Sequence, residues 1–149
     1  MKLAVGCDPA GFELKGRIVE HLEARGHQVA DVGCHSAEPA DYPDFAALVC
    51  RAVVAGDADR GILICGTGQG MAIAANKMRG IRAALCFDVL PAILSREHNN
   101  ANVLCTGAWI VEAERAIRVV DAWLFGKYSG DPIHERRIDK IHASEGAPP

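Results

Sequence analysis

Residues 61–70 read GILICGTGQG, an apolar run that ends in a cysteine and then breaks into glycines. Residues 61–64 predict a strand buried on both faces, because short continuous apolar runs are typical of parallel strands covered by helices. Cys65 then lies at the carboxyl end of that strand, where open α/β sheets bind their ligands. The glycines allow close backbone approach, and residues 71–77 resume helical character. A thiol, backbone N–H donors and a helix N-terminus therefore converge, which predicts an active site.

Strand-like and helix-like segments alternate on both sides of this stretch. The other expected strands are residues 3–7, 27–32, 81–86 and 103–105, and the expected helices are 12–25, 43–56, 71–78, 88–98 and 111–124. This alternation predicts an α/β fold, a three-layer Rossmann-like (flavodoxin-like) domain with a five-stranded parallel sheet and a C-terminal helix. We expect residues 1–142 to form a single domain and residues 143–149 to form a flexible tail.

The composition excludes several classes of protein. The 149 residues suffice for one domain with its own core. The 16 basic and 19 acidic residues give a net charge of −3, which does not favour nucleic-acid binding. No apolar stretch approaches the roughly 18 residues needed to cross a bilayer, and no signal peptide precedes the first strand. We therefore expect a soluble cytoplasmic protein that binds neither nucleic acid nor a membrane.

The cysteines do not follow the spacing of a disulfide framework or a metal site. The chain has six of them and no C-x-x-C pair, and several lie inside apolar runs. Most are therefore expected to be small buried hydrophobic residues, and Cys65 is the exception because of its position. The six are Cys7, Cys34, Cys50, Cys65, Cys86 and Cys105.

The glycine loop fails three motifs that bind nucleotides or phosphate. A dinucleotide fingerprint has its third glycine one residue later than Gly70, and a P-loop has lysine where Met71 stands. A cysteine phosphatase loop resembles this one but has an arginine at that same position. What remains is a cysteine that acts as nucleophile or base, with Thr67 and backbone N–H groups beside a developing oxyanion. The alternative is a tight strand–helix turn around a buried cysteine.

A second polar cluster lies before the fifth strand, where residues 96–102 read REHNNAN. Such a run is unfavourable next to a strand unless its groups are used, although a satisfied surface or core histidine is the ordinary role for His98. Asp8 follows the first strand, at the edge of the sheet where Cys65 is expected. Cysteine, threonine, histidine and aspartate at one edge predict proton transfer without a metal.

Eight segments carry a resemblance to a known family: residues 6–8 (GCD), 10–12 (AGF), 41–43 (DYP), 61–68 (GILICGTG), 73–77 (IAANK), 80–83 (GIRA), 94–99 (LSREHN) and 121–124 (DAWL). Over nearly its whole length the chain resembles the type B ribose-5-phosphate isomerases and the related galactose-6-phosphate isomerase subunits. The resemblance implies an aldose–ketose isomerase that uses a cis-enediolate and no metal or other cofactor. It also implies a small sugar or sugar phosphate as substrate, and a homodimer or tetramer with the site at the subunit interface.

The family's roles carry over to matching residues of this chain. Cys65 is implied to be the base that moves a proton between C1 and C2. Thr67 and the loop amides are implied to hold the enediolate oxygens, and His98 to help open the sugar ring. The other implied substrate contacts are Asp8, Tyr42, Gly66, Gly68, Gly70, Asn99 and Arg137.

Three positions at or beside the family's phosphate contacts differ here. Pro9 replaces a histidine, and Trp109 and Ile133 each replace an arginine. Each lost charge-assisted hydrogen bond is worth roughly 1.5–3 kcal/mol. Arg137 then remains of the cationic set, although residues 134–137 equally fit a solvated helix face. We hypothesise a substrate other than ribose 5-phosphate, phosphorylated or not, or a reorganised pocket for its tail.

Two further functions stay open on sequence alone. One is a non-catalytic subunit of such an isomerase, which the presence of Cys65, Thr67 and His98 does not favour. The other is a flavodoxin-like nucleotide or flavin binder, which would need ring- or phosphate-binding signals that the loop lacks. An absorbance spectrum of the purified protein would test for flavin.

Overall fold

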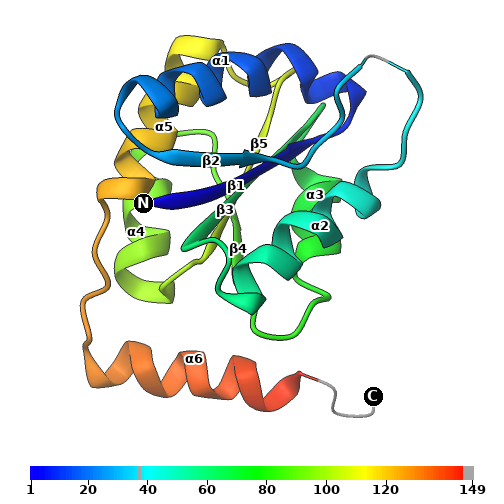
Figure 1. Ribbon diagram of the computed structural model, residues 1–149. Coiled ribbons are helices and arrows are strands. Elements are labelled where there is room, and N and C mark those ends of the chain that lie inside the picture. Colours follow the sequence, from blue (N-terminus) through cyan, green and yellow to red (C-terminus); the bar gives the residue numbers. More distant parts are fainter. Residues whose placement is uncertain (37, 146–149) are drawn as a thin grey trace.

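The computed structural model describes residues 1–36 and 38–145, in which five parallel strands alternate with six α-helices (Figure 1). The strands are β1 (Lys2–Cys7), β2 (Gln28–Asp31), β3 (Arg60–Cys65), β4 (Ala83–Leu85) and β5 (Val103–Gly107). The helices are α1 (Phe12–Ala24), α2 (Tyr42–Ala55), α3 (Gln69–Ala75), α4 (Val89–Asn99), α5 (Ala113–Phe125) and α6 (Pro132–Ser144), with a 3-10 turn η1 (Pro9–Gly11) after β1. The sheet order is β2-β1-β3-β5-β4, which confirms the predicted α/β fold with a five-stranded parallel sheet and a C-terminal helix.

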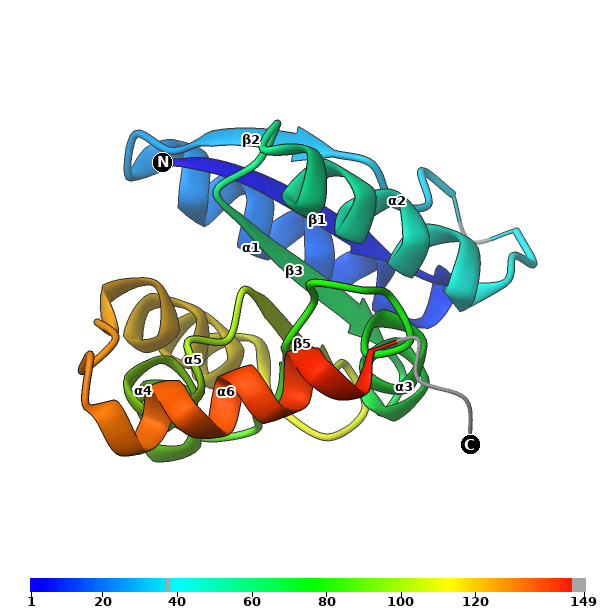
Figure 2. The ribbon, with the colours of Figure 1, turned by 90° about the horizontal axis from the view of Figure 1, so that it is seen from below.

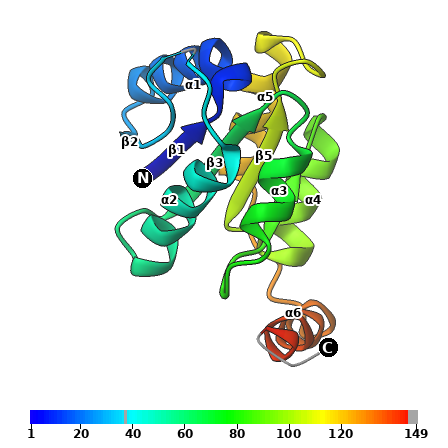
Figure 3. The same cartoon turned by 90° about the vertical axis from the view of Figure 1, so that its right-hand side faces the viewer.

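Helices cover both faces of the sheet (Figures 2 and 3). On one face α1, α4 and α5 share a core with Ile62 and Ile64 of β3, and on the other α2 and α3 share one with Leu63 and Cys65. Successive side chains of a strand point to opposite faces, so an unbroken apolar run is what a strand between two helical layers requires. The prediction of a strand buried on both faces is confirmed, and Cys65 faces the layer of α2 and α3.

The chain reverses its winding direction between the neighbouring strands β1 and β3. From β1 it moves outward to β2, whereas from β3 it continues to the side of β5 and β4. Cys7 pairs with Ile64 across the two strands, so Asp8 and Cys65 leave the sheet side by side. Open α/β sheets hold their ligands at such a switch point, outside the carboxyl ends of the strands.

Asn76 makes two elements shorter than the sequence predicts. Its side-chain N–H donates to the carbonyls of Ala72 (3.0 Å) and Ala83 (2.9 Å), and its side-chain oxygen accepts from the Ala83 N–H (2.9 Å). Helix α3 therefore ends at Ala75 instead of residue 78, and β4 begins at Ala83 instead of residue 81. An asparagine side chain that takes over backbone hydrogen bonds competes with helix continuation.

Helix α6 lies apart from the two helical layers (Figures 1 and 3). The Asp131 carboxylate accepts from the Ile133 N–H (2.8 Å) and caps its first turn. At the other end the Glu145 carboxylate accepts from the Gly80 N–H (3.1 and 3.0 Å). Helix α6 continues to Ser144, two residues past the predicted boundary at residue 142, and residues 146–149 of the predicted tail lie outside the described residues.

In the described part of the chain, no helix has the length and apolar character that spanning a membrane requires.

Candidate active site

Cys65 ends β3 and is nearly buried, at 5% exposure. Its Sγ accepts a hydrogen bond from the backbone N–H of Gly68 at 3.1 Å. An N–H group that points at sulfur favours negative charge on it. The turn between β3 and α3 therefore places a backbone hydrogen-bond donor against the Cys65 sulfur at the switch point of the sheet.

The loop glycines are fixed by their close neighbours. Gly68 has a φ of 77°, a conformation that glycine adopts without strain. A Cβ on Gly66 would come within 2.6 Å of the Trp109 ring, and a Cβ on Gly70 within 2.8 Å of the Tyr42 ring. Two aromatic rings thus flank the loop, one from the end of β5 and one from the start of α2. Because the glycines carry no side chains, the loop presents its backbone directly.

Thr67 lies in the same loop, and its backbone packs closely against Gly107. Gly107 pairs with Cys65 across β3 and β5, and a Cβ on it would lie 2.5 Å from the carbonyl carbon of Thr67. The Thr67 Oγ1 accepts from the Gln69 N–H at 3.4 Å, and its own proton can be donated to a ligand oxygen. Sequence reasoning named Thr67 and missed Gly107; the available signal was a glycine at the end of the fifth strand.

Gly107→Ala is expected to lower the free energy of unfolding by about 1–3 kcal/mol, because the added methyl group overlaps the Thr67 backbone. Denaturant unfolding followed by circular dichroism measures the change. The matched control is Gly16→Ala in α1, where a Cβ meets nothing within 4 Å. It is expected to raise stability by about 0.5–1 kcal/mol, as alanine does in helix interiors. Equal effects of the two changes would contradict the role of Gly107.

Asp8 completes this edge of the sheet. Its N–H donates to the carbonyl of Ile64 (3.2 Å), and its Oδ1 accepts from the Gly11 N–H (3.1 Å). A carboxylate has lone pairs beyond that single bond, so Asp8 can also accept from a ligand hydroxyl. The predicted residues that the structure brings together are Asp8, Tyr42, Cys65, Thr67 and the glycines 66, 68 and 70, which we call the carboxyl-edge cluster. Among the described residues, no group of three His, Cys, Asp or Glu side chains is arranged to hold a metal ion.

A pocket of about 500 Å³ opens beside the carboxyl-edge cluster, between α1 and the connection from β5 to α5. Pro9 and Trp109 both line it, and Trp109 is 74% exposed. Among the described residues that line the pocket, Arg17 is the one basic residue, and its guanidinium is paired with Glu114 at 2.8 Å. The pocket therefore combines an aromatic surface with a cation that already has a partner.

His98 does not lie at this edge within one chain. Helix α4 starts beyond the carboxyl end of β4 and returns the chain to the start of β5, and His98 is in its last turn. Strand β5 begins at Val103, which pairs with Gly61, and ends at Gly107, which pairs with Cys65. Four residues separate the two ends, a length of roughly 13 Å at the usual strand rise, and α4 leads to the end that is far from Cys65. The expectation that His98 shares an edge with Cys65 in one chain is therefore wrong.

His98 instead belongs to a group of polar residues at the amino edge of the sheet. Its ring stacks on that of His134 in α6, with centroids 4.4 Å apart and planes inclined by 16°. Arg137 lies three residues further along α6, on the same side of the helix, and is exposed. We call His98, Asn99, His134 and Arg137 the amino-edge cluster; Ile133 adjoins it. The two stacked histidines are far apart in sequence, so no local sequence pattern predicts this contact.

Comparison with known proteins covers both clusters. Residues 3–141 match the family model described as Ribose/Galactose Isomerase. Ribose-5-phosphate isomerase B of Escherichia coli (strain K12) is 51% identical over 144 residues, which are 97% of this chain and 96% of that protein. The structure of Clostridium thermocellum ribose-5-phosphate isomerase B has a TM-score of 0.94 at 47% identity and covers 96% of each chain. That of Mycoplasma genitalium ribose-5-phosphate isomerase B with bound ribulose-5-phosphate has a TM-score of 0.92 at 42% identity, over 99% of this chain and 97% of that one.

The matched residues run from β1 through the glycine loop and into α6, and so include the elements that carry both clusters. Cys65 with its N–H donor lies where the fold places ligands. On the family match and the near-complete coverage by its relatives, the chain belongs to the Ribose/Galactose Isomerase family.

Proposed function

We propose that this protein is an aldose–ketose isomerase of the ribose-5-phosphate isomerase B kind, with Cys65 as its catalytic base. The observation that supports it most directly is the Cys65 Sγ, 3.1 Å from the Gly68 N–H at the switch point of the sheet. A relative 51% identical is named ribose-5-phosphate isomerase B, and a structure of a 42% identical relative contains ribulose-5-phosphate. We accordingly assign a sugar phosphate as the substrate, either a pentose phosphate or a related short sugar.

In the proposed reaction the Cys65 thiolate removes the proton from C2 of the open-chain aldose. An S–H bond forms, the C2–H bond breaks, and the electron pair passes to the carbonyl group to give an enediolate. N–H groups of the loop and the Thr67 hydroxyl donate to the two enediolate oxygens, as oxyanion-hole donors do. Cys65 then returns a proton to C1, the hydroxyl proton on the C2 oxygen passes to the C1 oxygen, and C2 becomes the carbonyl carbon of the ketose. Asp8 and Tyr42 contact the remaining hydroxyl groups of the sugar.

The proposal includes a second copy of the chain, because the two clusters lie at opposite edges of one sheet. In a homodimer the amino-edge cluster of one chain faces the carboxyl-edge cluster of the other, and His98 assists ring opening across the interface. Helix α6 supports this arrangement, since it stands apart and carries Ile133 and Ile141, which are 41% and 45% exposed. A tetramer would repeat the same pairing. We also propose a cytoplasmic location, where phosphorylated sugars are metabolised.

A second substrate class is favoured by the pocket beside Pro9 and Trp109. It is a short aldose or ketose whose distal end differs from that of ribose 5-phosphate. A phosphate dianion is held by charge-assisted donors, and the basic residue that lines this pocket, Arg17, is already paired with Glu114. The Trp109 ring instead offers an apolar face to the carbon-rich side of a sugar.

Trp109→Arg is expected to raise kcat/KM for ribose 5-phosphate by about tenfold, because one added charge-assisted hydrogen bond is worth roughly 1.5–3 kcal/mol. The measurement is a panel of four- to six-carbon aldoses and ketoses, each with and without phosphate, on wild type and variant. The matched control is Trp109→Leu, which removes the ring without adding charge and is expected to change that value by less than about threefold.

The same panel decides between the two substrate classes. Preference of the wild type for ribose 5-phosphate, with little gain in Trp109→Arg, would support the first class and contradict the second. Preference for a different sugar would reverse that conclusion. Turnover of no member of the panel would contradict the isomerase proposal itself.

A further inference from the structure

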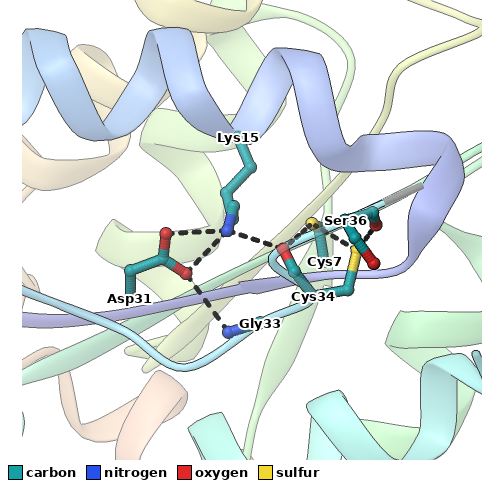
Figure 4. Close-up of polar contacts among 6 residues, drawn as sticks. All are labelled: Cys7, Lys15, Asp31, Gly33, Cys34 and Ser36. Carbon is teal, nitrogen blue, oxygen red and sulfur yellow. Dashed lines mark hydrogen bonds and ion pairs between the residues drawn. The ribbon is translucent and has the colours of Figure 1, made fainter. Parts of the chain in front are cut away.

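Two thiols that the proposed reaction does not use face each other at the end of β1 (Figure 4). Cys7 is the last residue of β1 and Cys34 lies in the loop after β2, and their Sγ atoms are 3.8 Å apart. The Cys34 N–H donates to the Cys7 carbonyl at 3.1 Å, which continues the parallel pairing of β1 with β2. The register of β1 and β2 places Cys34 one residue past the position opposite Cys7. A strand spacing of about 4.8 Å and a rise of about 3.3 Å then give a Cα separation of roughly 6 Å, within the range that disulfides span. We propose that Cys7 and Cys34 are a modification site, a dithiol that a peroxide oxidises to an intrachain disulfide.

Closing the disulfide requires only a small movement. The sulfur atoms must approach by about 1.8 Å to reach the S–S bond length of about 2.05 Å. The sulfur atoms make two thiol hydrogen bonds: the Cys34 thiol donates to the Ser36 carbonyl (3.1 Å) and the Cys7 thiol to the Cys34 carbonyl (3.9 Å). Because Cys34 belongs to a loop and Cys7 to the central part of the sheet, Cys34 makes most of the movement.

A buried cation lies beside the two thiols. Lys15 of α1 is 2% exposed, and its ammonium group donates to both carboxylate oxygens of Asp31 (2.7 Å each) and to the Cys34 carbonyl (2.9 Å), as Figure 4 shows. A neighbouring positive charge stabilises a thiolate, the form of cysteine that reacts, and here the Asp31 carboxylate offsets part of that charge. Burial raises the pKa of Cys7 well above its ordinary value, Cys34 and Asp31 add to that rise, and Lys15 opposes it. Both thiols are buried, and Cys34, which lies in a loop and is 6% exposed against 0% for Cys7, reacts first and Cys7 second.

The chemistry balances with hydrogen peroxide as the oxidant. The Cys34 thiolate attacks one peroxide oxygen, an S–O bond forms, the O–O bond breaks, and the hydroxide that leaves takes up a proton to become water. Cys7 then attacks the Cys34 sulfur as a thiolate, its proton passing to the departing oxygen. The S–S bond forms as the S–O bond breaks, and a second water leaves. Two thiols have lost two electrons, and one peroxide molecule has gained them.

The disulfide acts on the carboxyl-edge cluster through its position. Cys7 directly precedes Asp8, and Gly33 packs so closely on β1 that a Cβ there would be 2.2 Å from the Cys7 nitrogen. Drawing Cys34 towards Cys7 therefore presses the Gly33 backbone against the end of β1 that positions Asp8. We therefore expect oxidation to lower isomerase activity and reduction to restore it. This consequence rests on the proposed isomerase function.

The experiment treats the reduced full-length protein with increasing hydrogen peroxide and counts free thiols after denaturation. We expect wild type to lose two thiols, a tryptic digest to contain a linked pair of peptides carrying Cys7 and Cys34, and dithiothreitol to reverse both changes. Cys34→Ser is expected to form no linked peptides at the same peroxide dose. Cys50 lies in the same tryptic peptide as Cys34, residues 26–51. Cys50→Ala, which removes this buried cysteine from α2, is expected still to form the link to the Cys7 peptide, which assigns the link to Cys34.

Activity is followed in the same samples, because peroxide can also oxidise Cys65. Loss of activity in wild type at a dose that leaves Cys34→Ser active would support the link to the site, and equal loss in both would refute it. If Cys7 and Cys34 both stay free while Cys65 is oxidised, the modification site is refuted. If the reduced protein shows no isomerase activity, the proposed function fails, whereas the peptide map still decides whether the disulfide forms.

Discussion

Cys65→Ser is expected to lower kcat/KM for aldose–ketose isomerisation by about a thousandfold, the usual scale for losing a general base. The serine hydroxyl can still accept the Gly68 N–H that now points at Sγ, so the glycine loop keeps its shape. A hydroxyl is a far weaker base than a thiolate near neutral pH, so the loss reports on proton transfer. Steady-state isomerisation assays measure it, with circular dichroism to check the fold.

A second readout comes from isomerisation in deuterated water. Wild type is expected to place solvent deuterium at the carbon that receives the proton, and Cys65→Ser is not. The matched control is Cys50→Ala, in which another buried cysteine is lost; burial, partly opposed by Arg51, raises the pKa of that thiol to about 11. Its kcat/KM is expected to stay within about threefold of wild type. Near-normal activity of Cys65→Ser would remove Cys65 as the base.

The fold could be predicted because its signals are local. Residues 61–65 carry an unbroken apolar pattern that fits a strand between two layers, and the structure places helices on both faces. The end of α3 could not be predicted in this way. It depends on Asn76, whose side chain bonds to Ala72 within the helix and to Ala83 beyond it, and nothing in the helical period marks that contact.

The candidate site divides in the same manner. Cys65 and Thr67 were predictable together because one short loop holds both of them. Gly107 was missed because its close approach to Thr67 exists only after β5 pairs with β3. The edge at which His98 lies depends on where α4 ends relative to β5, and a sequence pattern that marks a polar cluster gives no information on that direction.

The separation of Cys65 and His98 leads to the second large effect. Cys65→Ala and His98→Gln are each expected to be at least about a hundredfold less active than wild type when purified alone. Co-expressed in equal amounts, the two chains are expected to recover about a quarter of wild-type activity, because half of random dimers are mixed and one of the two sites in each mixed dimer is intact. The intact site takes Cys65 from one variant chain and His98 from the other.

The matched control pairs Cys65→Ala with Thr67→Ala. Both residues belong to the carboxyl-edge cluster of a single chain, so every site in a mixed dimer lacks one of them and no activity should return. Recovery with His98→Gln but not with Thr67→Ala would mean that the site takes its two edges from different chains. Absence of recovery in both mixtures, with mixed dimers confirmed by differently tagged chains, would mean that His98 does not act across an interface. In one chain His98 lies near the start of β5 and Cys65 beside its end, so the two residues meet only across an interface. That result would therefore contradict the proposed role of the dimer in catalysis.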